Sequence, residues 1–209
     1  MTEQFRKLRR ILAARREEQP LRSVLVTSCL PGEGKTTVSI NLSAVLASRE
    51  GSTVILIDAD MRRRNLSALL GLKGSSGLAA VLAEETDVER YLVGTDIDGL
   101  YVLPAGNPSV NPAELVAADR MKDLLRFLTE RYDNAYVIVD STPLGSTSEP
   151  NVLCSMVDAI LLVILAESTQ RDLVKREIQE LDRKKIIGVV LNRAEFETSS
   201  YSSYYRYYK

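Results

Sequence analysis

The sequence predicts one α/β domain, a mostly parallel central sheet between two layers of helices, and three observations lead to that prediction. The chain has 209 residues, the size of a single domain with short appendages, and 45% of them are hydrophobic. Short runs rich in valine and isoleucine alternate with longer segments of helical period. The runs are continuously apolar and do not alternate with polar residues, so both faces of each strand must be covered, as in a parallel sheet.

The predicted elements alternate along the chain. The apolar runs predict strands at 23–28, 53–58, 100–105, 136–141, 158–165 and 186–192. The helical period predicts helices at 34–49, 63–70, 76–84, 112–131, 149–156 and 169–183, and a further helix over 2–17 before Pro20. We therefore divide the chain into an N-terminal helix (1–20), an α/β domain (21–195) and a C-terminal tail (196–209).

Composition excludes several kinds of chemistry. The chain has no histidine, which rules out a histidine-based triad, an imidazole metal site and a histidine pH switch. Cys29 and Cys154 form no C-x-x-C pair, so a reducing compartment is expected. No apolar run approaches the roughly 20 residues of a spanning helix, and the start carries no signal-peptide pattern. A net charge of −1 predicts no nucleic-acid partner, and any role at a membrane is expected to come through a partner.

A phosphate-binding loop is predicted directly after the first strand. Residues 29–37 read CLPGEGKTT and match the second half of G-x-x-x-x-G-K-[ST], with Cys29 in place of the first glycine. Such a loop turns backbone N–H groups toward phosphate oxygens at a helix N-terminus, while its lysine reaches the β- and γ-phosphates. A chance GKT in a glycine-rich turn is the alternative. The candidate ATP-binding residues are Pro31, Gly32, Glu33, Gly34, Lys35, Thr36 and Thr37.

Three aspartates are predicted to converge on this loop. Asp58 ends the second strand, Asp60 follows it, and Asp140 lies at the end of the fourth, at the sheet edge where open α/β folds bind ligands. Thr36, Asp60 and Asp140 are the candidate Mg²⁺ ligands, and Asp58 is preferred over Asp60 as a catalytic base. Helix capping is the alternative role for any one of the aspartates. Arg62 is a further candidate, for orienting phosphates.

Tyrosine is concentrated at the C-terminus. Five of the nine tyrosines lie in the last nine residues: Tyr201, Tyr204, Tyr205, Tyr207 and Tyr208. The tail around them has no aliphatic residue and no apolar periodicity, so it is not expected to join a core. We expect an accessible, mobile terminus.

These motifs resemble those of the bacterial tyrosine kinase family, the autokinases of capsule and exopolysaccharide synthesis on the MinD/ParA branch of phosphate-loop ATPases. The resemblance spans nearly the whole chain. It rests on EQFRKLR from 3, PGEGKTT from 31, ILIDADMRR from 55, LPAGNPSVNPAEL from 103, VIVD from 137, GVVLNR from 188 and the tyrosine cluster. Leu30 stands where MinD and ParA relatives carry an additional lysine, which favours the kinase branch.

The resemblance implies an ATP- and Mg²⁺-dependent protein tyrosine autokinase whose tail tyrosines are phosphorylated between neighbours in a ring, eight protomers in the family. Glu3, Arg6 and Arg9 are then expected at the subunit interface, and their spacing places them along one side of a helix; a solvated helix face is the alternative. Asn192 matches the position that reads adenine in related ATPases. The family also implies a transmembrane polysaccharide co-polymerase as activator, a cognate tyrosine phosphatase, and a cytoplasmic location at the inner face of the membrane.

Two other functions stay open on the sequence alone. One is a nucleotide-switched ATPase of the MinD/ParA kind that phosphorylates no protein; Leu30 and the tyrosine tail weigh against it. The other is a structural ring protein without catalysis. The complete set Lys35, Thr36, Asp58, Asp60 and Asp140 weighs against that second alternative.

Overall fold

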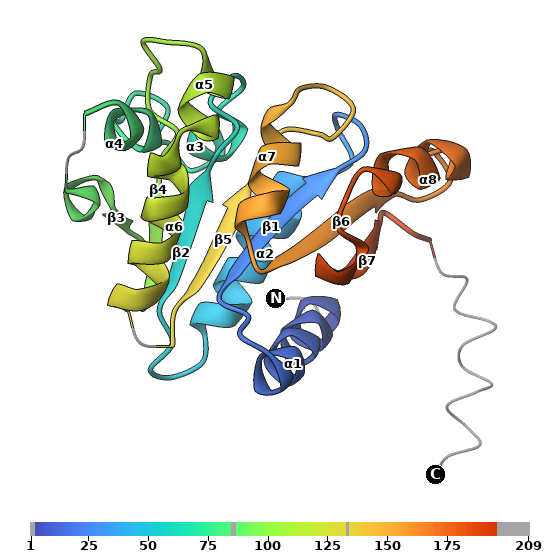
Figure 1. Ribbon diagram of the computed structural model, residues 1–209. Helices are drawn as coiled ribbons and strands as arrows, with labels where there is room; N and C mark the ends of the chain where they lie inside the picture. The colour runs from blue at the N-terminus through green and yellow to red at the C-terminus, as the bar shows by residue number, and fades with distance from the viewer. Residues whose placement is uncertain (1–2, 85–86, 133, 196–209) are drawn as a thin grey trace.

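A seven-stranded sheet forms the centre of the molecule in the computed structural model, which describes residues 3–84, 87–132 and 134–195 (Figure 1). The strand order is β3-β4-β2-β5-β1-β6-β7. Every neighbouring pair is parallel except β3 and β4, which are antiparallel. The strands are β1 (Ser23–Ser28), β2 (Val54–Asp58), β3 (Val93–Gly94), β4 (Leu100–Leu103), β5 (Tyr136–Asp140), β6 (Ala159–Leu165) and β7 (Ile186–Asn192).

Helices cover both faces of the sheet. The α-helices are α1 (Glu3–Glu18), α2 (Lys35–Ala47), α3 (Asn65–Leu69), α4 (Leu78–Glu84), α5 (Pro112–Ala117), α6 (Asp119–Arg131), α7 (Glu149–Met156) and α8 (Arg171–Gln179), and the 3₁₀ helices are η1 (Val88–Tyr91) and η2 (Arg183–Lys185). One apolar core joins a sheet face to α1, α2 and α3, and a second core joins the other face to α4 through α8. The predicted three-layer α/β fold is confirmed.

Successive residues of the central strands alternate between the two cores. Val24 and Val26 of β1 pack with Leu42 of α2, whereas Leu25 between them packs in the opposite core. All residues of β1, β2 and β5 are buried. This explains the continuous apolar runs inside these strands, 24–26, 54–57 and 136–139, because neither face meets water.

The structure differs from the sequence prediction at β7. This strand pairs only with β6, and Val189 and Leu191 are 52% and 55% exposed. The expectation that both faces of every strand are covered is therefore wrong for β7. The physical reason is its place at the end of the sheet, which the apolar pattern of the strand does not encode.

The helix predicted over 112–131 is two helices. Ala118 between α5 and α6 has an extended backbone, with φ −70° and ψ 148°. Val116 and Met121 are both fully buried in the same core, although a continuous helix would place them roughly 140° apart around its axis. The break at Ala118 lets both side chains face the sheet, so packing overrides the helical propensity of alanine here.

The N-terminal helix α1 packs against α2 through a buried leucine and an arginine that forms hydrogen bonds. Leu12 is fully buried in the core with α2. Arg9 Nη1 donates to the Val45 carbonyl at 3.2 Å and to Ser48 Oγ at 3.1 Å, at the C-terminal end of α2. Glu3 and Arg6 instead form an exposed ion pair at 3.4 Å. Of the three residues expected at a subunit interface, Glu3 and Arg6 are accessible, and Arg9 is engaged within its own chain.

We expect Arg9→Ala to lower the free energy of unfolding by about 1 kcal/mol, because it removes charged hydrogen bonds at a helix C-terminus. Arg6→Ala is the matched control on the same helix, and it should cost less than about 0.5 kcal/mol because its ion pair is exposed. Urea denaturation of the two variants, at equal protein concentration, measures the difference. Equal stabilities would show that the Arg9 contacts with α2 contribute nothing to the fold.

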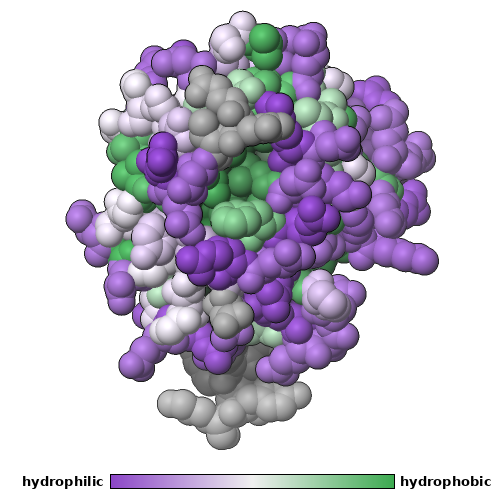
Figure 2. All heavy atoms as spheres, turned by 60° about the vertical axis from the view of Figure 1, so that its left-hand side comes forward, coloured by the Kyte–Doolittle hydropathy of each residue, from purple (hydrophilic) through white to green (hydrophobic). Residues whose placement is uncertain are grey.

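An apolar hollow of about 460 Å³ lies between α4, η1 and α6. Its lining includes Val81, Val88, Leu124 and Phe127 together with Asp87, Arg120 and Asp123. The space-filling view from that side shows apolar surface gathered near the middle of the face and surrounded by polar side chains (Figure 2). None of the helices within the described ranges is both long and apolar enough to cross a membrane.

Candidate nucleotide-binding site

The phosphate loop connects the end of β1 to the start of α2, as the sequence predicts. Gly32 and Gly34 have φ values of +85° and +97°, the left-handed region that glycine adopts without strain. Gly34 is the N-cap of α2, so the first N–H groups of a 13-residue helix follow it directly. Free N–H groups and the positive end of the helix dipole are what a phosphate group requires.

Two neighbouring side chains hold this loop in shape. The buried Glu33 carboxylate accepts from the Leu30 N–H at 2.7 Å and from the Thr169 hydroxyl, which links the loop to the turn after β6. Asn192 Nδ2, at the end of β7, donates to the Glu33 carbonyl at 2.8 Å. Glu33 therefore faces the protein through its side chain, and only its backbone N–H is a candidate for phosphate binding. Asn192 lies against the loop, at the nucleotide-binding edge of the sheet.

Gly34→Ala is expected to weaken nucleotide binding at least about tenfold, because the added Cβ would displace the Asn192 amide from its hydrogen bond to the Glu33 carbonyl and the backbone would also be strained. Gly32→Ala is the matched control. It has the same kind of strain but no atom within 4 Å of the added Cβ. Titration with a fluorescent ATP analogue should show the larger loss for Gly34→Ala, and Gly34→Ala should cost less affinity in an Asn192→Ala background than in the wild-type chain. Equal losses in both glycine variants would contradict the close approach of Asn192.

Lys35 and two aspartates meet at the carboxyl edge of the sheet. Lys35 is 8% exposed, and its Nζ lies 3.6 Å from Asp60 Oδ2 and 3.4 Å from Thr36 Oγ1. Asp140 Oδ1 accepts from Ser39 Oγ at 3.0 Å. Burial raises the pKa of Asp140 to about 7, against the opposing effect of the Lys35 charge. The predicted convergence of Asp60 and Asp140 on the phosphate loop is present in this geometry.

The donor set fits a hard divalent cation such as Mg²⁺. Asp60 Oδ2 and Asp140 Oδ2 are buried oxygens with no hydrogen-bond partner among the described residues. Unsatisfied buried carboxylate oxygens are costly, and Mg²⁺ prefers such ligands together with water and substrate phosphates. Within the same ranges, no three acidic, cysteine or histidine side chains form a complete metal cage. A cation here would therefore depend on the Thr36 hydroxyl, water and the nucleotide for its other ligands.

Asp58 is held differently from Asp60 and Asp140. It is fully buried, and its Oδ2 accepts from the Ser67 N–H at 2.8 Å and from Ser67 Oγ at 2.6 Å. Its Oδ1 accepts from the Asp60 N–H at 3.2 Å. Burial raises the pKa of Asp58, although the hydrogen bonds from Ser67 oppose that effect. A carboxylate has about four acceptor positions, so Asp58 retains one on Oδ1.

Arg62 projects from the turn after β2 and contacts two other segments. Its Nε donates to Glu149 Oε1 at 2.8 Å, and its Nη2 donates to Asn111 Oδ1 at 3.3 Å. Its side chain is 45% exposed, whereas Glu149 is buried. The structure therefore brings Arg62 to the edge of the site through protein contacts that the sequence reasoning did not include.

Four residues around the site were not predicted from the sequence: Ser39, Ser67, Asn111 and Glu149. Ser39 lies one helical turn after Lys35, so the helical period could have placed it beside Asp140. The other three come from α3, the α5 N-terminus and α7, and no spacing in the sequence relates them to Asp58 or Arg62. The five candidate tyrosines of the tail lie outside the described residues.

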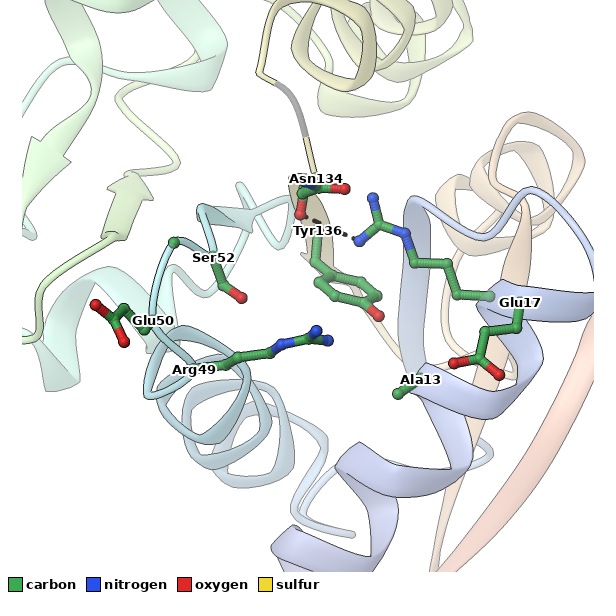
Figure 3. Close-up of a pocket in the computed structure, with 9 residues that line it drawn as sticks. Ala13, Glu17, Arg49, Glu50, Ser52, Asn134 and Tyr136 are labelled. Carbon is green, nitrogen blue, oxygen red and sulfur yellow. Dashed lines mark hydrogen bonds between the residues drawn. The ribbon is translucent and has the colours of Figure 1, made fainter.

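A pocket of about 220 Å³ opens at the opposite edge of the sheet, where β5 begins and α1 crosses the turn before β2 (Figure 3). Arg16 stacks 4.4 Å above the Tyr136 ring and donates to the Asn134 carbonyl. The lining also includes Arg49, Glu17 and Glu50, so its charges balance. Its lining contains a single glycine, Gly51, in the turn before β2, and no helix begins at its described residues, so we assign phosphate binding to the other edge.

The fold and the glycine loop define the class of the protein, a phosphate-loop NTPase with an α/β sandwich. A family model described as an AAA domain matches residues 24–183. The chain belongs to the family of bacterial tyrosine-protein kinases. Tyrosine-protein kinase YwqD of Bacillus subtilis (strain 168) is 31% identical over 206 residues, which are 98% of this chain and 86% of that protein.

Solved structures agree with this assignment. The kinase domain of the Escherichia coli tyrosine kinase ETK is 31% identical, with a TM-score of 0.81 over 92% of this chain and 77% of that one. The Pyrococcus furiosus cell division ATPase MinD is 28% identical, with a TM-score of 0.63 over 88% of this chain and 79% of that one. The chain is thus similar to both branches considered from the sequence, and the kinase domain superposes better.

Proposed function

We propose that this protein is an ATP-dependent protein tyrosine autokinase that phosphorylates its own C-terminal tyrosines. The observation that carries the proposal is the phosphate loop, with Lys35 Nζ 3.6 Å from Asp60 Oδ2. Asp60 Oδ2 and Asp140 Oδ2 are both buried and have no hydrogen-bond partner among the described residues. The family supports the same activity, because its named members are tyrosine-protein kinases. ATP is the phosphoryl donor, and Thr36, Asp60 and Asp140 are the proposed Mg²⁺ ligands.

The chemistry follows from charge placement. The tyrosine phenol oxygen attacks the γ-phosphorus, the bond to the β–γ bridging oxygen breaks, and ADP leaves. Lys35 and the N–H groups of the loop stabilise the negative charge on the phosphate oxygens. Mg²⁺, when bound, adds positive charge beside these oxygens.

A base is required because a free phenol has a pKa near 10. We assign this role to Asp58, whose raised pKa favours proton acceptance and whose Oδ1 has an acceptor position left. Asp60 is assigned to Mg²⁺ or water, since its Oδ2 faces Lys35. Asn192 is proposed to contact the adenine, which its place beside the phosphate loop allows.

The acceptors are proposed to be Tyr201, Tyr204, Tyr205, Tyr207 and Tyr208, presented to a neighbouring protomer in a ring. Glu3 and Arg6, exposed on α1, support a role in ring contacts. Each phosphotyrosine adds about −1.5 to −2 charge, so phosphorylation should weaken the ring by repulsion. We further propose a transmembrane co-polymerase as activator at the inner face of the cell membrane, a cognate phosphatase, and a role in capsule or exopolysaccharide synthesis.

The test is to incubate the protein with Mg·ATP, with and without the activator's cytoplasmic segment, and to map phosphate by mass spectrometry. We expect phosphotyrosine within residues 201–208 and none after all five tyrosines are replaced by phenylalanine. Solution mass, measured in parallel, should fall after phosphorylation. A tail that stays unmodified in every condition would contradict the proposed function.

A MinD-type ATPase without kinase activity is the second candidate, favoured by the likeness to the Pyrococcus furiosus MinD. Leu30, which is 40% exposed, stands in place of the additional loop lysine of that branch. This candidate predicts ATP hydrolysis that is unchanged by the five phenylalanine substitutions and leaves no phosphate on the protein. The same mass-spectrometry experiment separates the two candidates.

A further inference from the structure

The ion pair between Arg62 and Glu149 joins a half-exposed guanidinium to an almost completely buried carboxylate. The Glu149 side chain is 2% exposed, and its Oε1 accepts from Arg62 Nε at 2.8 Å. Burial alone would raise the pKa of Glu149, but hydrogen bonds around it and the Arg62 charge outweigh burial and lower the pKa. Glu149 is therefore a buried carboxylate held in its charged form, which needs a cation in a fixed place.

Arg62 is fixed by two of its three guanidinium nitrogens. Nε is bonded to Glu149 and Nη2 to Asn111, which also caps α5 by accepting from the Ala113 N–H at 3.2 Å. The guanidinium is planar, so two such bonds determine its orientation. Nη1 has no hydrogen-bond partner within the described ranges, and the side chain is 45% exposed. One set of donors is thus oriented and open to a ligand.

The three segments joined at Arg62 all surround the nucleotide-binding edge of the sheet. Arg62 follows Asp60 by two residues, and Asp60 Oδ2 lies 3.6 Å from Lys35 Nζ. Glu149 opens α7, the first helix after the strand that ends in Asp140. Asn111 opens α5, after β4. Loops from β2, β4 and β5 therefore fix one guanidinium beside the site, where positive charge stabilises a transferring phosphoryl group.

We propose that Glu149 is a positioning residue that orients Arg62 toward the phosphoryl group or the tyrosine oxygen during transfer. This inference rests on the proposed kinase function. Glu149 touches neither ATP nor tyrosine in this role and acts only through Arg62. A contact that merely joined three loops would affect folding, whereas an orienting contact affects turnover.

The substitutions that test this role are chosen from the burial of Glu149 and the partial exposure of Arg62. Glu149→Gln keeps the volume and one acceptor oxygen but removes the charge, and the half-exposed Arg62 that remains is solvated by water. Glu149→Asp keeps the charge and shortens the reach. Arg62→Ala leaves a buried carboxylate unpaired and risks misfolding, so it is also combined with Glu149→Gln. Glu89→Gln is the matched control, because Glu89 Oε1 pairs with Arg131 Nε at 3.3 Å on η1 and α6, away from the site.

The experiment uses the full chain with Mg·ATP and its activator, and it measures kcat and KM for ATP in tyrosine phosphorylation. A fluorescent ATP analogue gives nucleotide affinity, and thermal melting gives Tm. We expect Glu149→Gln to lower kcat by about tenfold or more, as misplacement of a catalytic group does, while nucleotide affinity stays near wild type and Tm falls too little to unfold the protein at the assay temperature. Glu149→Asp should recover part of kcat, and Glu89→Gln should change nothing.

Comparing the kcat values of the single and double variants shows whether Glu149 acts through Arg62. The double variant Glu149→Gln with Arg62→Ala should be no slower than Arg62→Ala, because Glu149 acts only through Arg62. Three results would each overturn the inference. They are a double variant in which the losses in kcat of the two single variants multiply, an unchanged kcat in Glu149→Gln, and a Glu149→Gln protein in which only Tm falls. ADP formation is recorded in the same reactions. If wild type makes ADP but no phosphotyrosine, the kinase proposal fails, and the same comparison of variants on ADP formation then decides the role of Glu149.

Discussion

Replacing Lys35 by methionine is expected to reduce tyrosine phosphorylation at least about 100-fold, because the phosphate loop then lacks the ammonium that stabilises charge on the γ-phosphate. Lys35 is 8% exposed, and its Nζ is 3.6 Å from Oδ2 of Asp60, one of the proposed metal ligands. Methionine keeps nearly the same length without the charge. Phosphotyrosine formed per minute at saturating Mg·ATP measures the effect.

Lys175→Met is the control for removing a lysine charge. Lys175 lies on α8 and pairs with Asp172 at 3.0 Å, with both side chains exposed. We expect this variant to retain wild-type turnover, because exposed pairs contribute little and α8 bears no site residue. Phosphorylation that survives Lys35→Met at more than a tenth of the wild-type rate would show that the loop lysine is not needed for transfer.

Asp140→Asn is expected to have two opposite effects. Phosphorylation should fall by about 100-fold or more, because a proposed Mg²⁺ ligand loses its charge. The nucleotide-free protein should become more stable, by about 1 kcal/mol, because Asp140 is a fully buried carboxylate whose Oδ2 has no hydrogen-bond partner in the part of the chain that the structure describes. Its pKa, raised by burial to about 7, reports the same unfavourable environment for the charge. Activity assays and urea denaturation at neutral pH measure the two effects.

Asp158→Asn provides the contrasting control at the start of β6. Asp158 Oδ2 accepts from the Arg22 N–H at 2.9 Å, the Ser23 N–H at 2.8 Å and Ser23 Oγ at 2.9 Å. Its carboxylate is well bonded, so the amide should cost about 1 kcal/mol or more of stability and leave catalysis intact. An Asp140→Asn protein that is destabilised as much as Asp158→Asn would indicate a structural role for Asp140 instead of a metal-binding one.

The residues behind these predictions differ in how much of their role the sequence alone indicates. Lys35 and Asp140 were identified from motif and strand end alone, because a phosphate loop needs its lysine and parallel strands share one carboxyl edge. The same reasoning placed Asp58 and Asp60 together. That reasoning did not distinguish the environments of Asp58 and Asp60. Ser67 donates two hydrogen bonds to Asp58, and Ser67 lies on α3, which only the tertiary fold places beside Asp58.

Arg9 and Arg62 make contacts that motif reasoning does not predict, and their proposed roles stay predictions. Both were assigned from their position in a motif, Arg9 to a subunit interface and Arg62 to phosphate. In the structure, Arg9 bonds to the end of α2, and Arg62 bonds to Glu149 and Asn111. A long charged side chain reaches partners that are distant in sequence, and its contacts therefore depend on how the elements pack.

The sequence by itself determined the parallel sheet, the order of its elements, the phosphate loop and the aspartates at the strand ends. Each of these features can be read from consecutive residues. A strand that is buried on both faces is a continuous apolar run, a tight phosphate loop needs glycines, and the aspartates directly end or follow such runs. Tertiary structure alone decided the exposed edge of β7, the break at Ala118, the anchoring of Arg9 and the pairing of Arg62 with Glu149. Those features arise between segments separated by tens of residues, and only the packed fold brings such segments within bonding distance.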